Sequence, residues 1–334
     1  MNDLYVAAAA SWLPEPVTLA QAEAAGRCTG ALARNTSMVS VCVSTGESAP
    51  EMAVLAAREA LRQTRYAGSD VDLILHACAY HQGHDMWSPA SYIQRFAVGN
   101  TCLAIEVRQM SNGGMAAFEL AAAYLRADHD KTAALITTAD RFCEPGFDRW
   151  TTDPSTICGD AGTAVVLSNR GGFARVRSLV TVADPGLEQG GRGDKPFSAA
   201  PLGAGAPIDI GGNTAVLVAE LGLERLLARI EAGQRECFER AALEADVKFA
   251  DIDWYVLPNM GRTRMKAHFF APFEIDPERT TWDWGRRVGH LGAGDQLGGL
   301  AHLLGEEGLF PGQLVLLAGI GAGFTWTTAV LEVL

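Results

Sequence analysis

The chain has 334 residues, of which 48% are apolar and 36 are glycine, a composition typical of a packed α/β protein rather than a disordered or fibrous chain. It carries 27 basic and 39 acidic side chains, and the net charge of −12 argues against nucleic acid or an anionic membrane as its main partner. Because no uninterrupted apolar run reaches about 18 residues, we expect no membrane span. The N-terminus lacks the basic region of a signal peptide, and we expect a cytoplasmic protein.

In the first half of the chain, strand-like apolar runs alternate with helical patterns of small residues. Ser48 and Glu51 form a capping box, which predicts the start of a helix that continues to residue 61. The other expected elements are a first strand at the N-terminus, a strand at 71–79, a helix at 89–98, a buried strand at 103–107, a helix at 112–125, and strands at 132–138 and 163–167.

The second half repeats this alternation. The expected elements are a strand at 173–182, a long helix at 214–245, a strand at 254–257, helices at 262–270 and 297–304, and strands at 313–317 and 324–333. The Gly- and Pro-rich stretch 184–212 lacks periodicity and is expected to form a long functional loop. Together the patterns predict an α/β fold with two halves, residues 1–170 and 171–334, each a sheet covered by helices.

Ser111 lies where the expected strand 103–107 gives way to the helix at 112–125. A hydroxyl in a sharp strand-to-helix turn lies at the positive end of the helix dipole, and Gly113 and Gly114 let a substrate approach the backbone closely. An acyl-transfer nucleophile would be placed in such a turn. On the turn alone, a serine that simply caps the helix is the stronger interpretation.

Three segments resemble the ketoacyl-acyl-carrier-protein synthase III enzymes of the thiolase superfamily, in the same order and at matching spacing. Residues 106–114 fall where that family carries Asp-x-Asn-Ala-Ala-Cys-x-Gly, residues 157–167 resemble its Gly-Asp-Gly-Ala-Gly-Ala-Val-Val-Leu segment, and residues 319–326 resemble its terminal Gly-rich turn. The resemblance covers nearly the whole chain and implies the thiolase fold, five αβαβα layers with two pseudo-symmetric halves. Ser111 then holds the position of the nucleophilic cysteine, either as the native residue or as a replacement of that cysteine.

The chain departs from this family at the other catalytic positions. The His of Pro-His-Gln-Ala-Asn is Asn259 here, and the Asn of Gly-Asn-Thr is His290. In the family these two side chains stabilise the enolate formed when a malonyl group loses CO2, so their loss argues against condensation. Instead, His290 supplies an imidazole that can take the proton from Ser111 or from an acceptor, and Asp295 supplies a carboxylate that fixes the tautomer and stabilises the imidazolium. A serine needs such a base because its hydroxyl is far less acidic than a cysteine thiol.

Residues 289–295 resemble the acyltransferase branch of this family in antibiotic and polyketide biosynthesis, such as the malonyltransferase of cervimycin formation; the starter-unit enzymes of anthracycline pathways are similar, with Ser as nucleophile. The resemblance implies transfer of an acyl group through Ser111 to a hydroxyl or amine of a natural-product acceptor, with the N–H groups of Ser111 and Gly323 as the oxyanion hole. Two alternatives stay open, a starter-unit condensing enzyme and a catalytically silent synthase subunit. For Asn259, an additional hydrogen bond and mere filling of the former His position are equally favoured.

The expected donor is an acyl carrier protein or another acyl thioester, and the expected acceptor is a small molecule. Family members that use coenzyme A carry an Arg after Trp-Thr-Asp, whereas Pro154 stands at that position here, which favours a carrier-bound acyl group. Arg262, Arg264 and Lys266 lie where family members dock the acidic carrier, although exposed helix charges are usually only solvated. The resemblance further implies a homodimer, with neither a metal nor another cofactor.

Overall fold

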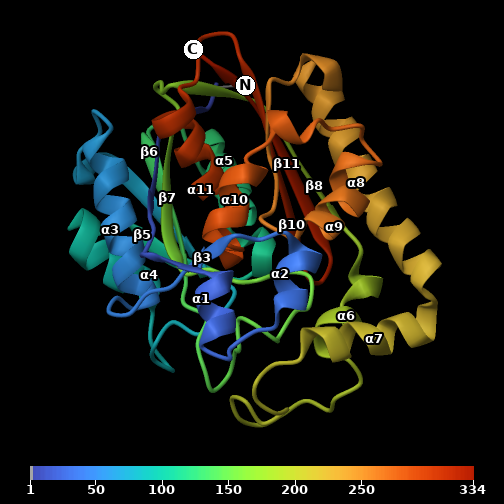
Figure 1. The fold of residues 1–334 in the computed structure, drawn as a ribbon. Coiled ribbons are helices and arrows are strands. Elements are labelled where there is room, and N and C mark those ends of the chain that lie inside the picture. The colour runs from blue at the N-terminus through green and yellow to red at the C-terminus, as the bar shows by residue number, and fades with distance from the viewer. Residues whose placement is uncertain (1–2) are drawn as a thin grey trace.

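The computed structural model describes residues 3–334, and at 306 and 307 it describes the backbone alone. Its main sheet is mixed and has nine strands in the order β5-β4-β6-β7-β1-β8-β11-β10-β9 (Figure 1), and β2 pairs with β3 in a small second sheet. The strands are β1 (Tyr5–Trp12), β2 (Pro16–Thr18), β3 (Ser40–Cys42), β4 (Val71–Ala77), β5 (Leu103–Val107), β6 (Ala133–Asp140), β7 (Ala161–Ser168), β8 (Ala174–Ala183), β9 (Trp254–Val256), β10 (Leu314–Gly321) and β11 (Thr325–Val333).

The helices connect these strands. The α-helices are α1 (Leu19–Ala24), α2 (Gly30–Thr36), α3 (Ala49–Arg62), α4 (Pro89–Ile93), α5 (Gly113–Ala127), α6 (Gln189–Arg192), α7 (Ile210–Leu221), α8 (Leu223–Ala245), α9 (Arg262–Met265), α10 (Trp282–Val288) and α11 (Asp295–His302). The 3-10 turns are η1 (Gly68–Asp70), η3 (Met110–Asn112), η4 (Pro185–Leu187), η5 (Phe249–Asp251), η7 (Pro277–Arg279) and η8 (Gly292–Gly294), and the π-helical turns are η2 (Gln94–Val98), η6 (Lys266–Phe270) and η9 (Leu303–Glu307). Across residues 3–334, no helix is both long and apolar enough to cross a membrane.

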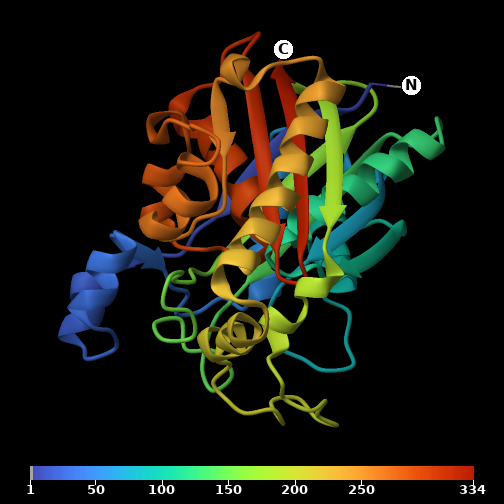
Figure 2. The ribbon, with the colours of Figure 1, turned by 90° about the vertical axis from the view of Figure 1, so that its right-hand side faces the viewer.

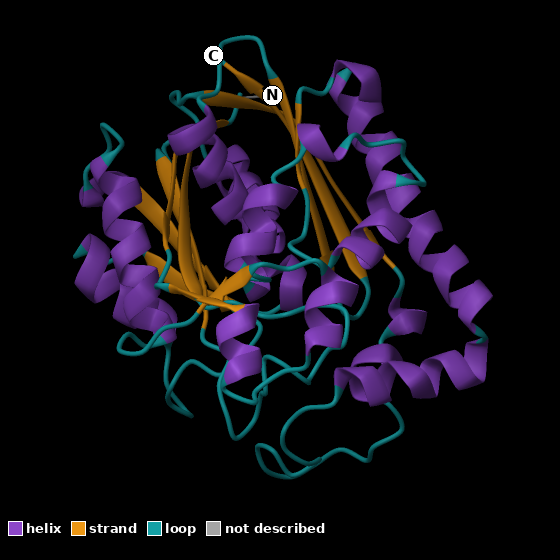
Figure 3. Cartoon of the chain, viewed as in Figure 1, coloured by secondary structure: helices purple, strands orange, loops and turns teal. Residues whose placement is uncertain are grey.

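Helices and strands alternate in five layers (Figures 1 and 3). On one outer face, α3 packs against β1, β6 and β7. In the middle, α5 contacts β4 and β6, while α11 contacts β1 and β10. On the other outer face, α8 covers β8 and β11, as Figure 2 shows. β1 and β8 pair at Tyr5–Arg175 and Val6–Ala174, a short junction that leaves the nine strands as two groups facing each other across α5 and α11.

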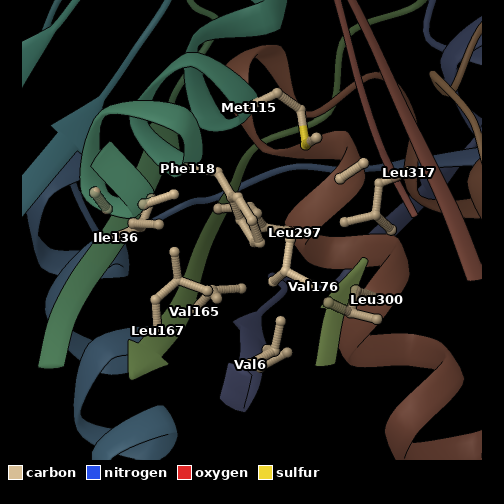
Figure 4. Packing of buried hydrophobic residues seen from close by; sticks show 14 of the residues in the cluster. Val6, Met115, Phe118, Ile136, Val165, Leu167, Val176, Leu297, Leu300 and Leu317 are labelled. Atoms are coloured by element: carbon tan, nitrogen blue, oxygen red, sulfur yellow. The ribbon is translucent and has the colours of Figure 1, made fainter. Parts of the chain in front are cut away.

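The core between the two groups of strands is built from small and branched apolar residues. Phe118 of α5, Leu297 of α11, Val165 of β7 and Leu317 of β10 belong to one buried cluster (Figure 4). β6 and β7 are buried along their whole length because helices cover both of their faces. This explains why their sequences are continuous apolar runs rather than alternating ones.

The strand predicted at 103–107 exists, but the prediction that it is buried is wrong. β5 pairs with β4 and is the last strand of the sheet on that side, within the part of the chain that the structure describes. Leu103 is 54% exposed and Ile105 is 42% exposed. An apolar run does not by itself distinguish a core strand from an edge strand. An edge strand that another surface covers carries the same apolar residues as a strand in the core.

The single helix predicted at 214–245 is also wrong. The chain forms α7 and α8, which run in different directions in Figure 1 and meet at Gly222. Gly222 has a φ of 84°, a left-handed conformation that ends α7 and that glycine adopts without a steric penalty. The stretch 184–212 is also not one loop, because it contains η4, α6 and the start of α7; within it, residues 193–209 lack a helix or strand.

The remaining expected elements are present within a few residues of their predicted bounds. The capping box is confirmed, since the backbone N–H and the hydroxyl of Ser48 both donate to Glu51, at 2.8 and 2.6 Å. The strands before Asn169 build one group of the sheet and those after Gly172 build the other, apart from β2 and β3. A domain boundary at residue 170 stays a prediction.

Candidate active site

Ser111 lies in η3, between the end of β5 and the start of α5. The preceding residue, Met110, has a φ of 48°, so the chain turns through a left-handed conformation that costs a non-glycine residue about 1–3 kcal/mol. The N-cap of α5 is Asn112, and no side chain makes a cap hydrogen bond there. The interpretation of Ser111 as a capping residue is therefore wrong, and its hydroxyl is directed elsewhere.

The hydroxyl of Ser111 contacts His290 at 2.8 Å, between Oγ and Nε2. On the other side of the same ring, Nδ1 lies 2.6 Å from Oδ2 of Asp295. In the neutral ring, Nδ1–H donates to this carboxylate, which leaves Nε2 as the acceptor for the Ser111 hydroxyl. The three side chains form a continuous path for a proton from Ser111 to His290, with Asp295 fixing the tautomer.

Asp295 is 1% exposed, and its carboxylate is satisfied by three partners. Oδ2 accepts from the backbone N–H of Asn259 at 2.8 Å as well as from the ring, and Oδ1 accepts from the N–H of Leu291 at 2.7 Å. A buried carboxylate with this many donors holds one orientation. The first turn of α11, where Asp295 lies, also favours a negative charge.

The environment of His290 favours the protonated ring. Burial by itself lowers the pKa of His290, but the neighbouring carboxylate of Asp295, with smaller contributions from Asp140 and Asp153, outweighs burial and raises the pKa above its ordinary value. A ring that readily accepts a proton is the property that a general base needs. The acid limb of a reaction that uses neutral His290 therefore lies above the ordinary histidine pKa.

Backbone pairing anchors His290 beside the Gly159–Asp160 segment. The N–H of His290 donates to Ile157 O, and the N–H of Gly159 donates to His290 O, both at 2.9 Å. Asp160 forms a buried ion pair with Arg149 at 2.9 Å and accepts from the N–H groups of Ser44 and Phe142. This explains why the segment 157–167 matters for the site although none of its side chains belongs to the proton path.

Asn259 acts on the site through its backbone and its amide. Besides its N–H bond to Asp295, its Nδ2 donates to Gly289 O at 3.0 Å, so the residue ties the turn before His290 to the end of β9. Gly323, with a φ of 141°, lies in the turn between β10 and β11, and a Cβ there would be 3.8 Å from Nε2 of Gln109, two residues before Ser111. Its role in an oxyanion hole stays a prediction.

The three cationic residues predicted to dock a carrier differ in their surroundings. Arg264 donates to Asp153 and to Thr156, both at 2.8 Å, and is partly buried. The guanidinium of Arg262 lies 5.5 Å from the centre of the Trp282 ring, and Arg262 and Lys266 are exposed. Among the side chains that the structure describes, those of residues 3–305 and 308–334, no group of three or more His, Cys, Asp or Glu is placed to hold a metal ion.

One residue beside the site was not among the predicted ones. Asp140 ends β6, is fully buried, and accepts hydrogen bonds from the N–H groups of Ala79, Tyr80 and Ala293. The sequence carried a signal, because an acidic residue at the carboxyl end of a buried strand lies at the edge of the sheet where sites gather. Its connection to Ala293 depends on the tertiary structure, since 153 residues separate them.

Comparison with known proteins assigns this arrangement to a family. The acyltransferase ChlB3 has 35% sequence identity to the chain, with a TM-score of 0.94 over 99% of this chain and 98% of ChlB3. The beta-ketoacyl-[acyl-carrier-protein] synthase III of Caulobacter vibrioides is 25% identical over 84% of both chains. The C-terminal family model of 3-oxoacyl-[acyl-carrier-protein] synthase III matches residues 243–333. The chain belongs to the synthase III family of the thiolase superfamily.

The fold agrees with this assignment. Synthase III from Aquifex aeolicus, 18% identical, superposes with a TM-score of 0.78 over 98% of this chain and 99% of its own. The predicted thiolase fold and the predicted family are therefore confirmed. The synthase III relatives are enzymes of the thiolase superfamily. The catalytic roles of Ser111, His290 and Asp295 stay predictions.

Proposed function

We propose that this synthase III family member is an acyltransferase that carries the acyl group on Ser111. The observation that carries the proposal is the path Ser111 Oγ–His290 Nε2 at 2.8 Å and His290 Nδ1–Asp295 Oδ2 at 2.6 Å. It supplies a serine with the positioned base that it needs and an orienting carboxylate behind that base. The similarity to the acyltransferase ChlB3 supports the same reaction class.

In the first step, Ser111 Oγ attacks the carbonyl carbon of an acyl thioester while its proton passes to Nε2 of His290. The negative charge that develops on the carbonyl oxygen is held by the backbone N–H groups of Ser111 and Gly323, and one such donor stabilises the transition state by about 3 kcal/mol. Collapse of the tetrahedral intermediate breaks the carbon–sulfur bond. The leaving thiolate takes the proton from His290, which returns to its neutral form.

In the second step, His290 takes the proton from a hydroxyl or amine of the acceptor, which attacks the acyl-Ser111 ester. The new carbon–oxygen or carbon–nitrogen bond forms, the Ser111 ester bond breaks, and His290 returns the proton to Ser111 Oγ. Both steps use the same proton path in opposite directions. This cycle needs no oxidant, reductant or metal.

The donor is proposed to be an acyl carrier protein. A surface pocket of about 360 Å³ is lined by Asn35, Pro154, Thr263 and Arg264, together with Gly261, which lies two residues after Asn259. Arg262 and Lys266 are exposed beside it on α9 and η6, and they give this face of an otherwise acidic protein cations for an acidic carrier. Pro154 stands where an Arg would contact the nucleotide of coenzyme A, and it has no cationic group to do so, which favours the carrier protein as donor.

We also propose a homodimer formed through the edge strand. β5 presents an unpaired backbone edge within the described residues. Leu103 and Ile105 on this strand are exposed apolar side chains, and so is Met110, three residues after it. An exposed apolar edge strand is a template for pairing with another strand. A second copy of the chain offers the same edge and would cover these side chains in a two-fold contact.

The test is acylation followed by transfer. The protein is incubated with acetyl, malonyl and benzoyl groups, each as an N-acetylcysteamine thioester and each on a purified acyl carrier protein, and intact mass is recorded. We expect an adduct of acyl mass on the wild-type chain and none on Ser111→Ala. The acylated protein is then mixed with sugars, aminocyclitols and simple alcohols, and a new ester or amide is expected.

His290→Ala should abolish both steps, whereas His129→Ala, at the opposite end of α5 from Ser111, should leave them intact. Release of CO2 and formation of a β-keto product from the malonyl donor would support a condensing enzyme instead. If no donor acylates the wild-type chain, the protein is a silent subunit and the proposal is wrong. Faster loading from the carrier protein than from the free thioester supports the carrier as donor.

A further inference from the structure

Asp140 is a buried carboxyl group that joins two loops at one end of the sheet. Its Oδ1 accepts from the N–H groups of Ala79 and Tyr80, at 2.9 and 2.7 Å, in the loop that follows β4. Its Oδ2 accepts from the N–H of Ala293 at 3.0 Å, in the η8 turn. The carboxylate has no exposed surface, so these bonds form without competition from solvent.

The η8 turn lies between Asp140 and the helix that follows Ser111. On one side, Gly292 has a φ of 60°, and a Cβ at this residue would overlap Oδ2 of Asp140. On the other side, a Cβ at Gly114 would be 2.5 Å from Ala293 O, so η8 also touches the first turn of α5. The turn is therefore held between a carboxylate and a helix, in a space that admits no extra carbon atom.

Both ends of η8 lead to the proton path. His290 lies two residues before the turn, and Asp295 follows its last residue. A shift of η8 away from Asp140 moves both residues relative to Ser111, which lies in η3 directly before α5. The Ser111–His290 distance thus depends on how closely η8 is drawn to the end of β6.

We propose that Asp140 is a positioning residue that holds η8 against the first turn of α5 and so sets the geometry between Ser111 and His290. The catalytic use of that geometry rests on the proposed function, but the positioning itself does not. Asp140 touches neither Ser111 nor a substrate group, and it acts through Ala293 and the turn.

The charge of Asp140 has a second effect on the same site. His290 faces three carboxylates, from Asp295 on α11, Asp140 on β6 and Asp153 in the β6–β7 connection, and each of them raises the pKa of the ring. Burial raises the pKa of Asp140 itself to about 7, partly offset by its backbone hydrogen bonds. Loss of the Asp140 charge therefore lowers the pKa of His290, and the acid limb of acylation moves to lower pH.

Asp140→Asn is the first test, because the amide is of similar size but carries no charge. The readouts are the His290 pKa, measured by NMR of ring-labelled histidine and assigned with His290→Ala, and the rate of acyl-Ser111 formation with p-nitrophenyl butyrate. We expect a lower His290 pKa, an acid limb displaced to lower pH, and acylation slowed by about 100-fold at its maximum, the usual effect of a small misplacement of reacting groups.

Thr138→Val is the matched control. Thr138 lies two residues before Asp140 in β6, and its buried hydroxyl hydrogen-bonds to the Thr163 hydroxyl at 2.7 Å. The change removes a buried polar group beside η8 without altering a charge, so the His290 pKa should stay at its wild-type value. Gly292→Ala is the second variant, in case Asp140→Asn does not fold. Its methyl group must push η8 away from Asp140, and we expect slower acylation with the Asp140 charge retained.

The outcomes separate the two proposals. An unchanged His290 pKa in Asp140→Asn, or acylation at the wild-type rate in both Asp140→Asn and Gly292→Ala, overturns the positioning role. Failure of p-nitrophenyl butyrate to label Ser111 in the wild-type chain counts against the proposed function. The NMR titration decides on Asp140 in that case too, since it needs no turnover.

Discussion

At the scale of single residues, the direction of one hydroxyl separates the two interpretations of Ser111. In a capping serine, the hydroxyl oxygen accepts a hydrogen bond from a free N–H group of the helix. Ser111 Oγ instead contacts Nε2 of His290, and the α5 N-terminus has no side-chain cap. The serine and its base are interdependent, because a hydroxyl ionises far less readily than a thiol. The acylation rate should therefore depend more strongly on His290 when residue 111 is serine than when it is cysteine.

This dependence can be measured with a double-mutant cycle. In the serine background, His290→Ala should slow acylation by about 1,000-fold or more, as the loss of a base from such a set usually does. In the Ser111→Cys background, the fold-decrease in acylation rate caused by His290→Ala should be at least about 10 times smaller. A thiol with an ordinary pKa near 8.5 ionises in part without a base. Rates come from intact-mass time courses with one thioester. Equal losses in both backgrounds would show that His290 is not the base.

At the scale of elements, the site depends on how closely α5 and η8 approach. Gly113 and Gly114 were predicted to let a substrate approach the backbone, but the structure gives Gly114 a neighbour from the chain itself, the carbonyl of Ala293. Ser111 lies in η3, directly before α5, and η8 lies between His290 and Asp295. Because Gly114 has no side chain, η8 can approach α5 closely, and this approach brings Ser111 and His290 to hydrogen-bond distance.

Gly114→Ala tests this contact, because we expect the change to lower the free energy of unfolding, whereas the same change in most helices raises it. Within a helix this change normally stabilises by about 1 kcal/mol. Here the new methyl group would lie 2.5 Å from Ala293 O, so we expect a loss of about 1–3 kcal/mol in the free energy of unfolding and slower acylation. Gly211→Ala in α7 is the control, since its Cβ would meet only ordinary contacts at 3.4 Å or more. Urea unfolding gives both values, and stabilisation by Gly114→Ala would exclude a tight contact.

At the scale of the whole molecule, the proposed homodimer forms through the edge strand β5. Leu103 and Ile105 lie on the same side of the strand, and both side chains are exposed to solvent in the single subunit. Neighbouring exposed apolar side chains of this kind mark a surface that another protein covers. β5 also leads directly to the η3 turn with Ser111. Pairing between two copies along β5 would thus stiffen the support of the nucleophile in each.

Ile105→Glu should break the homodimer. A charge at the centre of the apolar edge cannot be buried without a partner, so the variant should elute as a monomer whereas the wild-type chain elutes as a dimer, measured by light scattering after size exclusion. Leu243→Glu is the control, because Leu243 is 80% exposed on α8, in the outer layer away from β5. A wild-type monomer, or a dimer that survives Ile105→Glu, would contradict an assembly through β5.

The sequence by itself determined the alternation of strands and helices, the family, and the identity of Ser111, His290 and Asp295 as candidates, since periodicity and motif order are properties of neighbouring residues. The tertiary structure decided which atoms meet. Ser111 and His290 are 179 residues apart, and their contact depends on two groups of strands closing around α5 and α11. The same holds for the exposure of β5 and for Asp140, whose partners come from distant loops. Burial and long-range hydrogen bonds follow from packing, and no local pattern encodes them.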